Sequence, residues 1–163
     1  MAKIAIVTGA SRGLGRNMAV NIARKGSDVI ITYRSRADLA ESAVSEIKAL
    51  GRRAVAFQLD SANVAKFPDF ARALSQTLKE TFGRETFDYL VHNAGDGLFA
   101  TLGETTVAQF DQQMNLHVKG VFFLTQALLP LMADGGSIVT IVSGIPTKPI
   151  RPNADTHPTS TAG

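Results

Sequence analysis

The sequence predicts an α/β fold in which a doubly wound parallel sheet of five strands, in the order 3-2-1-4-5, lies between two layers of helices. Short apolar runs alternate with amphipathic helical patterns along the chain. Strands separated by helices of this length pair in parallel, through right-handed crossovers. A glycine-rich turn also follows the first apolar run directly, as is typical of this fold class. These observations together predict a three-layer α/β/α architecture.

The first half of the chain contributes two predicted strand and helix pairs. Ile4–Val7 is short, apolar and rich in β-branched residues, as expected of a central strand covered on both faces. The glycine-rich turn leads into a predicted helix over Leu14–Lys25. Val29–Tyr33 is the second strand, and the amphipathic pattern over Ala37–Leu50 predicts a second helix that Gly51 closes.

The second half repeats this alternation. Ala54–Leu59 is the third predicted strand, and a helix follows from about Val64 to Phe82. Phe87–His92 is the fourth strand. A long helical pattern runs from about Val107 to Met132, and Ser137–Val142 is the fifth strand.

The glycine-rich turn is the strongest functional signal. It reads Thr8-Gly9-Ala10-Ser11-Arg12-Gly13-Leu14-Gly15. Its three glycines let the backbone turn sharply, approach a pyrophosphate and pack the next helix tightly against the sheet. That helix would point its free N–H groups and its positive dipole end at the phosphates. The turn therefore predicts a dinucleotide site, formed here by Gly9, Ser11, Arg12, Gly13, Leu14 and Gly15.

Composition limits the classes of protein that remain. The 163 residues are 45% hydrophobic and 19% charged, which suits one globular domain. We expect a dinucleotide-binding domain over residues 1–143 and an irregular tail over residues 144–163. The formal net charge is +3, but the basic residues are scattered, so we expect no nucleic-acid partner.

The chain has no cysteine, which excludes disulfides and cysteine metal sites, and we expect no bound metal. The amino terminus lacks the features of a signal peptide. The most apolar segment, Val118–Met132, is interrupted by Lys119, Gln126 and Pro130, so we expect no membrane span. The prediction is a cytoplasmic protein.

Several motifs occur in one order along the chain: the turn over Thr8–Gly15, Asp60, Asn93-Ala94-Gly95, Asn115 and Ser143. On these residues, from Lys3 to about Ser143, the chain resembles a short-chain dehydrogenase/reductase of the NADP-preferring kind, similar to 3-oxoacyl-carrier-protein reductases. The resemblance implies a Rossmann fold and an oxidoreductase that transfers a hydride between nicotinamide and a small carbonyl or alcohol substrate.

The end of the second strand indicates which cofactor is bound. An NAD site would place Asp or Glu there to hold the ribose 2′-hydroxyl, whereas this chain has Tyr33 and then Arg34. Arginine suits a 2′-phosphate, so we expect NADP(H). The resemblance implies that Asp60 accepts a hydrogen bond from adenine and that Asn93-Ala94-Gly95 lets the backbone approach the ribose. The cofactor residues beyond the turn are Tyr33, Arg34, Asp60, Ser61, Asn93, Ala94 and Gly95.

The catalytic residues match the family only in part. The resemblance implies that Ser143 holds the substrate carbonyl and that Asn115 completes a proton relay. The family's proton-donating tyrosine and its lysine partner are not found: one alignment places His157 and Thr161 in their positions, another Thr156 and Ser160. His157 is the candidate proton donor. We expect a weakly active or inactive chain, and the alternative is a catalytically dead NADP-binding or interaction protein.

The resemblance also implies a further helix, a substrate-covering loop and two strands after the lysine, so we expect a C-terminally incomplete chain that is either truncated or interrupted before its tail. It implies a homo-oligomer, dimer or tetramer, through the helix from Gln113 to Met132. A different reading, a flavodoxin-like or methyltransferase-like protein, requires the matches at Asp60 and Asn93 to be accidental.

Overall fold

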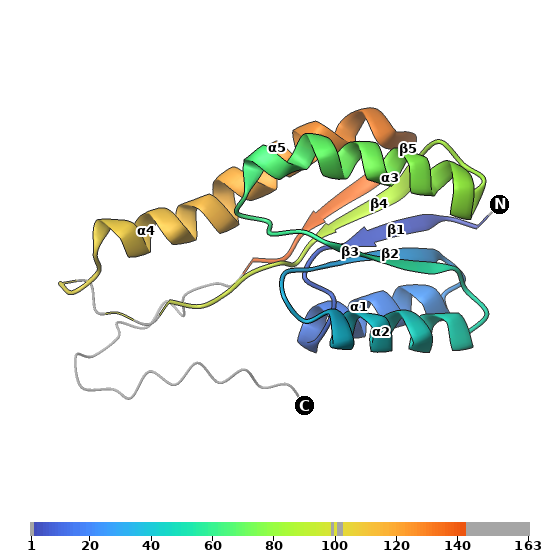
Figure 1. The fold of residues 1–163 in the computed structure, drawn as a ribbon, viewed down its shortest axis with the longest axis horizontal. Coiled ribbons are helices and arrows are strands. Elements are labelled where there is room, and N and C mark those ends of the chain that lie inside the picture. Colours follow the sequence, from blue (N-terminus) through green and yellow to red (C-terminus); the bar gives the residue numbers. More distant parts are fainter. Residues whose placement is uncertain (1, 99, 101–102, 143–163) are drawn as a thin grey trace.

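In the computed structural model, residues 2–98, 100 and 103–142 are described. Within these ranges five parallel strands form one sheet in the order β3-β2-β1-β4-β5, which confirms the predicted fold class and strand order (Figure 1). The strands are β1 (Ile4–Val7), β2 (Asp28–Tyr33), β3 (Ala54–Gln58), β4 (Phe87–His92) and β5 (Met132–Thr140).

Helices pack on both faces of the sheet (Figure 1). Helices α1 (Gly13–Arg24) and α2 (Ala37–Ala49) cover one face, and α3 (Phe67–Phe82) and α5 (Val121–Leu128) cover the other. Each face carries its own cluster of buried apolar side chains. Helix α4 (Val107–Met114) instead extends away from the sheet, and none of its residues is buried.

Local sequence explains where these helices begin and end. Pro68 lies in the first turn of α3, where its missing N–H costs no hydrogen bond, and a 3₁₀ turn over Val64–Lys66 precedes it. Gly83 ends α3 in the left-handed conformation, with φ of 62°. Thr106 begins α4 through a capping box with Gln109.

The long helix predicted from about Val107 to Met132 is helical almost throughout, but it is not one regular helix. A π-helical segment, Asn115–Gly120, joins α4 to α5, and a 3₁₀ turn over Leu129–Leu131 follows α5. Pro130 lies in that turn and cannot continue an α-helix, because it lacks an N–H. Single π-helical segments inside helices are frequent at functional sites.

Strand β5 begins at Met132 and ends at Thr140, whereas the sequence pattern predicted Ser137–Val142. Its pairing with β4 shifts register between Phe87 and Tyr89, because Phe87 faces Met132 and Tyr89 faces Ser137. Gly135 has φ of 75°, and a Cβ on Gly136 would lie 2.6 Å from the carbonyl oxygen of Asp88. The predicted start was wrong because this irregular pairing depends on β4 and not on local alternation.

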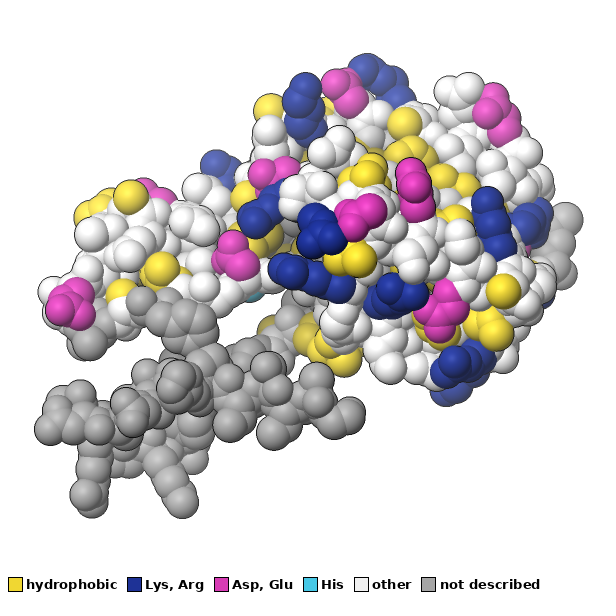
Figure 2. Space-filling view, turned by 60° about the horizontal axis from the view of Figure 1, so that its bottom comes forward, with side chains coloured by type: hydrophobic (Ala, Val, Ile, Leu, Met, Phe, Trp, Pro, Cys, Tyr) yellow, Lys and Arg dark blue, Asp and Glu magenta, His cyan; other side chains and the backbone are white. Residues whose placement is uncertain are grey.

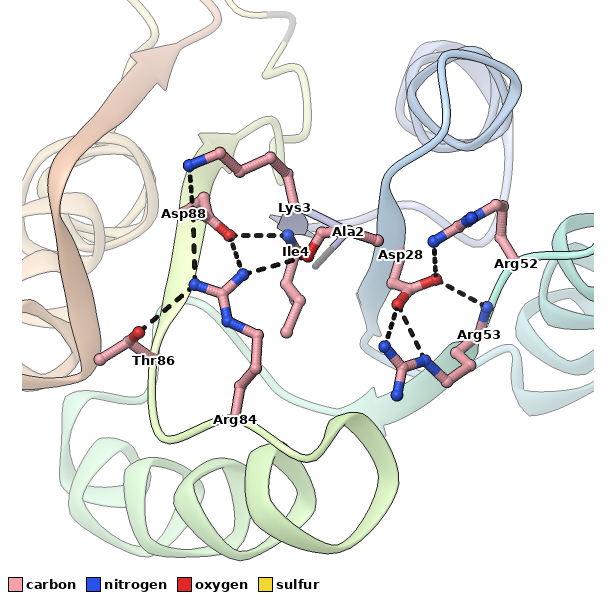
Figure 3. Close-up of polar contacts among 9 residues, drawn as sticks. All are labelled: Ala2, Lys3, Ile4, Asp28, Arg52, Arg53, Arg84, Thr86 and Asp88. Atoms are coloured by element: carbon pink, nitrogen blue, oxygen red, sulfur yellow. Dashed lines mark hydrogen bonds and ion pairs between the residues drawn. The ribbon is translucent and has the colours of Figure 1, made fainter.

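Two buried aspartates lie at the amino ends of β2 and β4 (Figure 3). Asp28 accepts hydrogen bonds from Arg52 Nη2 at 2.7 Å and from Arg53 Nε at 2.8 Å. Burial raises the pKa of Asp28, but these bonds outweigh it, and the net pKa is lowered. The charge of the buried Asp28 carboxylate is therefore paired with two arginines that reach it from the solvent side.

Asp88 is the second of these aspartates. It accepts hydrogen bonds from Lys3 Nζ at 2.8 Å, from Ile4 N at 2.9 Å and from Arg84. Burial acts to raise its pKa, but the three donors together lower the pKa of Asp88 to about 2. This carboxylate connects β4 to the start of β1, at the amino ends of these two parallel strands.

His92, the last residue of β4, is buried and connects the sheet to α5. Its Nε2 lies 2.8 Å from Thr125 Oγ1, which itself donates to Val121 O at 2.8 Å. Because the hydroxyl proton is used in that second bond, Nε2 of His92 is the donor of the first. Burial lowers the pKa of His92, so the neutral ring is the folded form.

In the described ranges, no helix is long and apolar enough to span a membrane. The same residues contain no group of three or more His, Asp or Glu side chains placed to hold a metal ion.

Candidate functional site

A cavity of about 340 Å³ lies at the carboxyl ends of β1, β2, β3 and β4. This is the edge at which open parallel sheets bind ligands, beside the point where the strand order reverses. Every residue predicted to contact the dinucleotide lines this one cavity: Gly9, Ser11, Arg12, Gly13, Leu14, Gly15, Tyr33, Arg34, Asp60, Ser61, Asn93, Ala94 and Gly95. The cavity is also lined by Ser35, Arg36, Leu59, Asp96 and Leu116.

The glycines of the turn are required by its geometry. Gly9 has φ of 64°, and a Cβ there would lie 2.8 Å from Ala94 Cα. Gly15 is similarly close, since its Cβ would lie 2.6 Å from Gly9 O. Gly13 has open space around it, but its φ is 56°. Glycine is therefore favoured there by its backbone conformation and not by a lack of space. The turn is therefore held against the loop after β4 with no room for a side chain at Gly9 or Gly15.

Thr8 and Asn93 hold these two loops together. Thr8 Oγ1 accepts hydrogen bonds from Asn93 N and Ala94 N, both at 2.9 Å. The Asn93 side-chain amide donates to Thr8 O at 3.0 Å and to Gly9 O at 3.3 Å. The cavity floor is therefore a rigid pair of loops from β1 and β4, the two strands at its centre.

The amino end of α1 faces the cavity. Arg12 precedes the helix without a side-chain cap, and the first turn contains no acidic residue. The first backbone N–H groups of any helix have no intrahelical acceptor, and in α1 no side chain replaces it. The helix dipole adds partial positive charge at the same end. Such an end binds anions without needing a dedicated side chain.

The charged groups of the cavity are mostly paired. Arg36 donates through two nitrogens to Asp38, two residues further along the chain, and this hydrogen bonding from Arg36 lowers the pKa of Asp38 to about 2. Arg34 Nη1 lies 3.7 Å from Asp96 Oδ2. Figure 2 shows Lys and Arg side chains interspersed with acidic ones on the face viewed there.

The loop after β4 also contacts the long helix. Gln113 Nε2 donates to Asp96 Oδ1 at 3.1 Å, and His117 Nε2 lies 3.1 Å from Asp96 O. Sequence reasoning missed both residues in this role. Their spacing of four residues places them on one face of a helix, and this spacing was the sequence feature that could have indicated a shared contact. They bring the π-helical segment against the cavity.

The same segment approaches the loop after β3. A Cβ on Gly120 would collide with Ser61 O, so only glycine permits this contact. The hydroxyl oxygen of Ser61 is buried and has no hydrogen-bond partner among the described residues. An unpaired buried hydroxyl is costly unless a ligand or water satisfies it.

The residues predicted for catalysis are placed differently. Asn115 is the first residue of the π-helical segment, from which only Leu116 lines the cavity among the described residues. Ser143 and His157, with the whole tail over residues 144–163, lie outside the described residues. The predicted boundary between domain and tail falls there too.

A family model for the short chain dehydrogenases matches residues 3–154. The chain belongs to this family. The matched segment includes all five strands and every described residue of the cavity.

Individual relatives agree with the family match. The chain is 35% identical over 150 residues to Arp2, a hydroxynaphthalene reductase-like protein of Metarhizium brunneum. This alignment covers 88% of this chain and 54% of that protein. The chain thus spans about half the length of the curated relatives it matches.

Solved structures of this family resemble the chain as well. A short chain dehydrogenase from Burkholderia cenocepacia in complex with NADP is 38% identical, with a TM-score of 0.75, over 85% of this chain and 54% of that one. A blue fluorescent protein from a metagenomic library in complex with NADPH is 38% identical, with a TM-score of 0.76, over 86% and 56%.

Proposed function

We propose that this chain binds NADP(H) in the cavity and is the cofactor-binding part of an oxidoreductase that acts on a small carbonyl or alcohol substrate. The observation that carries the proposal is the cavity itself. It combines the amino end of α1, which suits a pyrophosphate, with Arg34 directly after β2, where an NAD site would have a carboxylate. The solved relatives in complex with NADP and NADPH support it.

The described residues fit such a cofactor. Gly9, Gly13 and Gly15 leave the turn without side chains at three positions, so a pyrophosphate can approach the backbone there. The buried hydroxyl of Ser61 has a donor to offer a ligand. We propose that Arg34 and Arg12 bind phosphate groups and that Asp60, whose Oδ1 accepts from Ala62 N at 3.0 Å, accepts from the adenine amino group.

When bound, the nicotinamide would supply or accept the hydride. The part of this chain around Asn93-Ala94-Gly95 would orient the adjoining ribose, because Thr8 and Asn93 hold that loop rigidly. We propose that Ser143 holds the substrate carbonyl, that Asn115 belongs to a proton relay and that His157 is the available proton donor.

We propose that the chain is weakly active or inactive as a reductase. His157 and Thr161, or Thr156 and Ser160 in the other alignment, stand where the family pattern has tyrosine and lysine. Loss of a general acid raises a barrier by about 3–5 kcal/mol. The same observation favours a second candidate, a catalytically dead NADP-binding protein. NADPH binding without NADPH oxidation by a panel of aldehydes and ketones would select it.

The binding proposal is tested by titrating NADPH and NADH against the purified chain. Arg34→Ala is expected to weaken NADPH binding about ten- to a hundredfold, since a charged hydrogen bond to phosphate is lost, and to leave NADH binding nearly unchanged. The matched control is Arg72→Ala, which removes an exposed arginine paired with Asp69 on α3. Equal losses for both cofactors in Arg34→Ala would refute the assignment of Arg34 to the 2′-phosphate.

We also propose that the chain forms a homo-oligomer through α4, the π-helical segment and α5. In support, this surface exposes large apolar side chains, including Val118 at 52% and Phe122 at 64%. Exposed apolar patches of this kind mark interaction surfaces. Sedimentation equilibrium is expected to show a dimer or tetramer, and Phe122→Glu to shift it toward monomer.

A further inference from the structure

One ion pair crosses the cavity. Arg34 follows β2 and Asp96 follows β4, and β1 lies between these two strands in the sheet. The contact between Arg34 Nη1 and Asp96 Oδ2, at 3.7 Å, therefore connects the two sides of the strand that carries the glycine-rich turn. Both residues line the cavity. A ligand that uses Arg34 must compete with Asp96 for it.

The carboxylate of Asp96 is held in place from the helix side. Gln113 Nε2 donates to its other oxygen, Oδ1, at 3.1 Å. His117 Nε2 lies 3.1 Å from the backbone oxygen of the same residue. The loop is thus attached to α4 and to the π-helical segment, and Oδ2 is left to face Arg34.

The pair is weak enough to open. The side chain of Arg34 is 65% exposed and that of Asp96 is 32% exposed. Ion pairs with this exposure contribute little, because water and salt screen them. An arginine and a phosphate dianion form a stronger, bidentate contact. A 2′-phosphate would therefore displace the carboxylate, whereas a dinucleotide without that phosphate would leave the pair intact.

We propose that Asp96 is a specificity-determining residue: its carboxylate pairs with Arg34 across the cavity and lowers the affinity for dinucleotides that carry a 2′-phosphate. This inference rests on the proposed NADP(H) site. It predicts that the natural chain prefers NADPH over NADH less strongly than a chain in which Arg34 has no carboxylate partner. Gln113 is a positioning residue for this carboxylate.

The test compares the NADPH and NADH affinities of the full chain and of Asp96→Asn by fluorescence titration. Asparagine still accepts the hydrogen bond from Gln113 but carries no charge. The ratio of NADPH to NADH affinity is expected to rise about two- to fivefold, the range of an exposed ion pair. Gln113→Ala, which leaves the charge but frees the carboxylate, is expected to raise the ratio by less.

Two controls separate this effect from a general change of charge. Asp111→Asn removes the same charge from α4, away from the cavity, and is expected to leave the ratio unchanged. In an Arg34→Ala background, Asp96→Asn is expected to have no effect on the ratio, because its partner is gone.

The outcomes distinguish this inference from the proposed function. Suppose that the natural chain binds NADPH. The role of Asp96 is then overturned, and the NADP(H) site stands, if Asp96→Asn raises the affinities for NADPH and NADH equally. The same conclusion follows if Asp96→Asn changes the affinity ratio as much in the Arg34→Ala background as in the natural chain. If the natural chain binds neither dinucleotide, the proposed function is overturned, and this inference falls with it.

Discussion

Ile6 and Ile138 occupy one row of the sheet, on β1 and β5, and Leu90 of β4 lies between them. Ile6 is fully buried, whereas Ile138 is 42% exposed. The adjacent row repeats the difference: Val7 is buried and Val139 is exposed, with Val91 between them. Residues of the same kind, in the same rows of one sheet but on strands separated by β4, thus have opposite environments.

Helix placement explains the difference. Strands β1, β2 and β4 form the covered part of the sheet, since α1 and α2 pack on one face and α3 and α5 on the other (Figure 1). Strand β5 is the last strand of the described sheet, and most of its residues are exposed. A β-branched run therefore predicts a strand, but its burial depends on the helices packed over it.

Polar contacts follow the same division. Asp88 connects β4 to the start of β1, and Asp28 connects β2 to the residues before β3. Among the described residues, no ion pair connects β5 to its neighbour. The covered part of the sheet is thus held by burial and by paired charges, and β5 by its backbone ladder and partial burial.

The largest effect is expected for Asp88→Asn, which removes the charge that Lys3 and Arg84 share in a buried site. Breaking such a pair is expected to lower the free energy of unfolding by about 3–5 kcal/mol. Urea denaturation measures it. Asp69→Asn, in an exposed pair, serves as the control and is expected to change the midpoint little. Equal costs for the two variants would contradict the role of burial.

Ile6 and Ile138, in the same row of the sheet, are expected to differ in their contribution to stability. Ile6→Ala is expected to destabilise the protein by about 2–5 kcal/mol, because it leaves a cavity in a closed core. Ile138→Ala, the same substitution in the same row, is expected to cost less than about 1 kcal/mol because its side chain is partly in water. A large loss at Ile138 would mean that β5 is covered in solution.

His92 predicts a pH dependence at the boundary between these regions. Its pKa is lowered by burial from the ordinary 6.5, so the unfolded chain takes up a proton at a higher pH than the folded chain. The stability that the neutral ring contributes is therefore present above about pH 6.5 and is lost as the pH falls below it. Thermal denaturation above and below this pH measures the loss. His92→Leu is expected to flatten that part of the profile.

The smallest effect on stability is expected for Leu14→Ala. Leu14, in the first turn of α1, is an exposed apolar residue that lines the cavity. Its truncation is expected to change the free energy of unfolding by less than about 0.5 kcal/mol. NADPH affinity is expected to fall severalfold, because a bound dinucleotide would cover it. A stability loss without a binding loss would contradict this role.

Local patterns predicted the features that depend on few residues. The strand over Phe87–His92 was predicted with its observed bounds, since it is a short apolar run between clear breaks. The start of β5 was not, because Met132 and Ala133 continue a helical apolar pattern and become strand only by pairing with β4. The π-helical segment was also missed, since nothing local distinguishes Asn115–Gly120 from an α-helix.

The amino-acid sequence alone was sufficient for the parallel sheet, its strand order and the residues that gather at its carboxyl edge. Crossover handedness and the backbone demands of Gly9 and Gly13 act over short segments, so they can be read along the chain. The burial of Ile6 against the exposure of Ile138, the pair formed by Arg34 and Asp96, and the contact of His117 with the loop after β4 required the folded structure. Each depends on groups far apart in sequence, whose distances are set by packing.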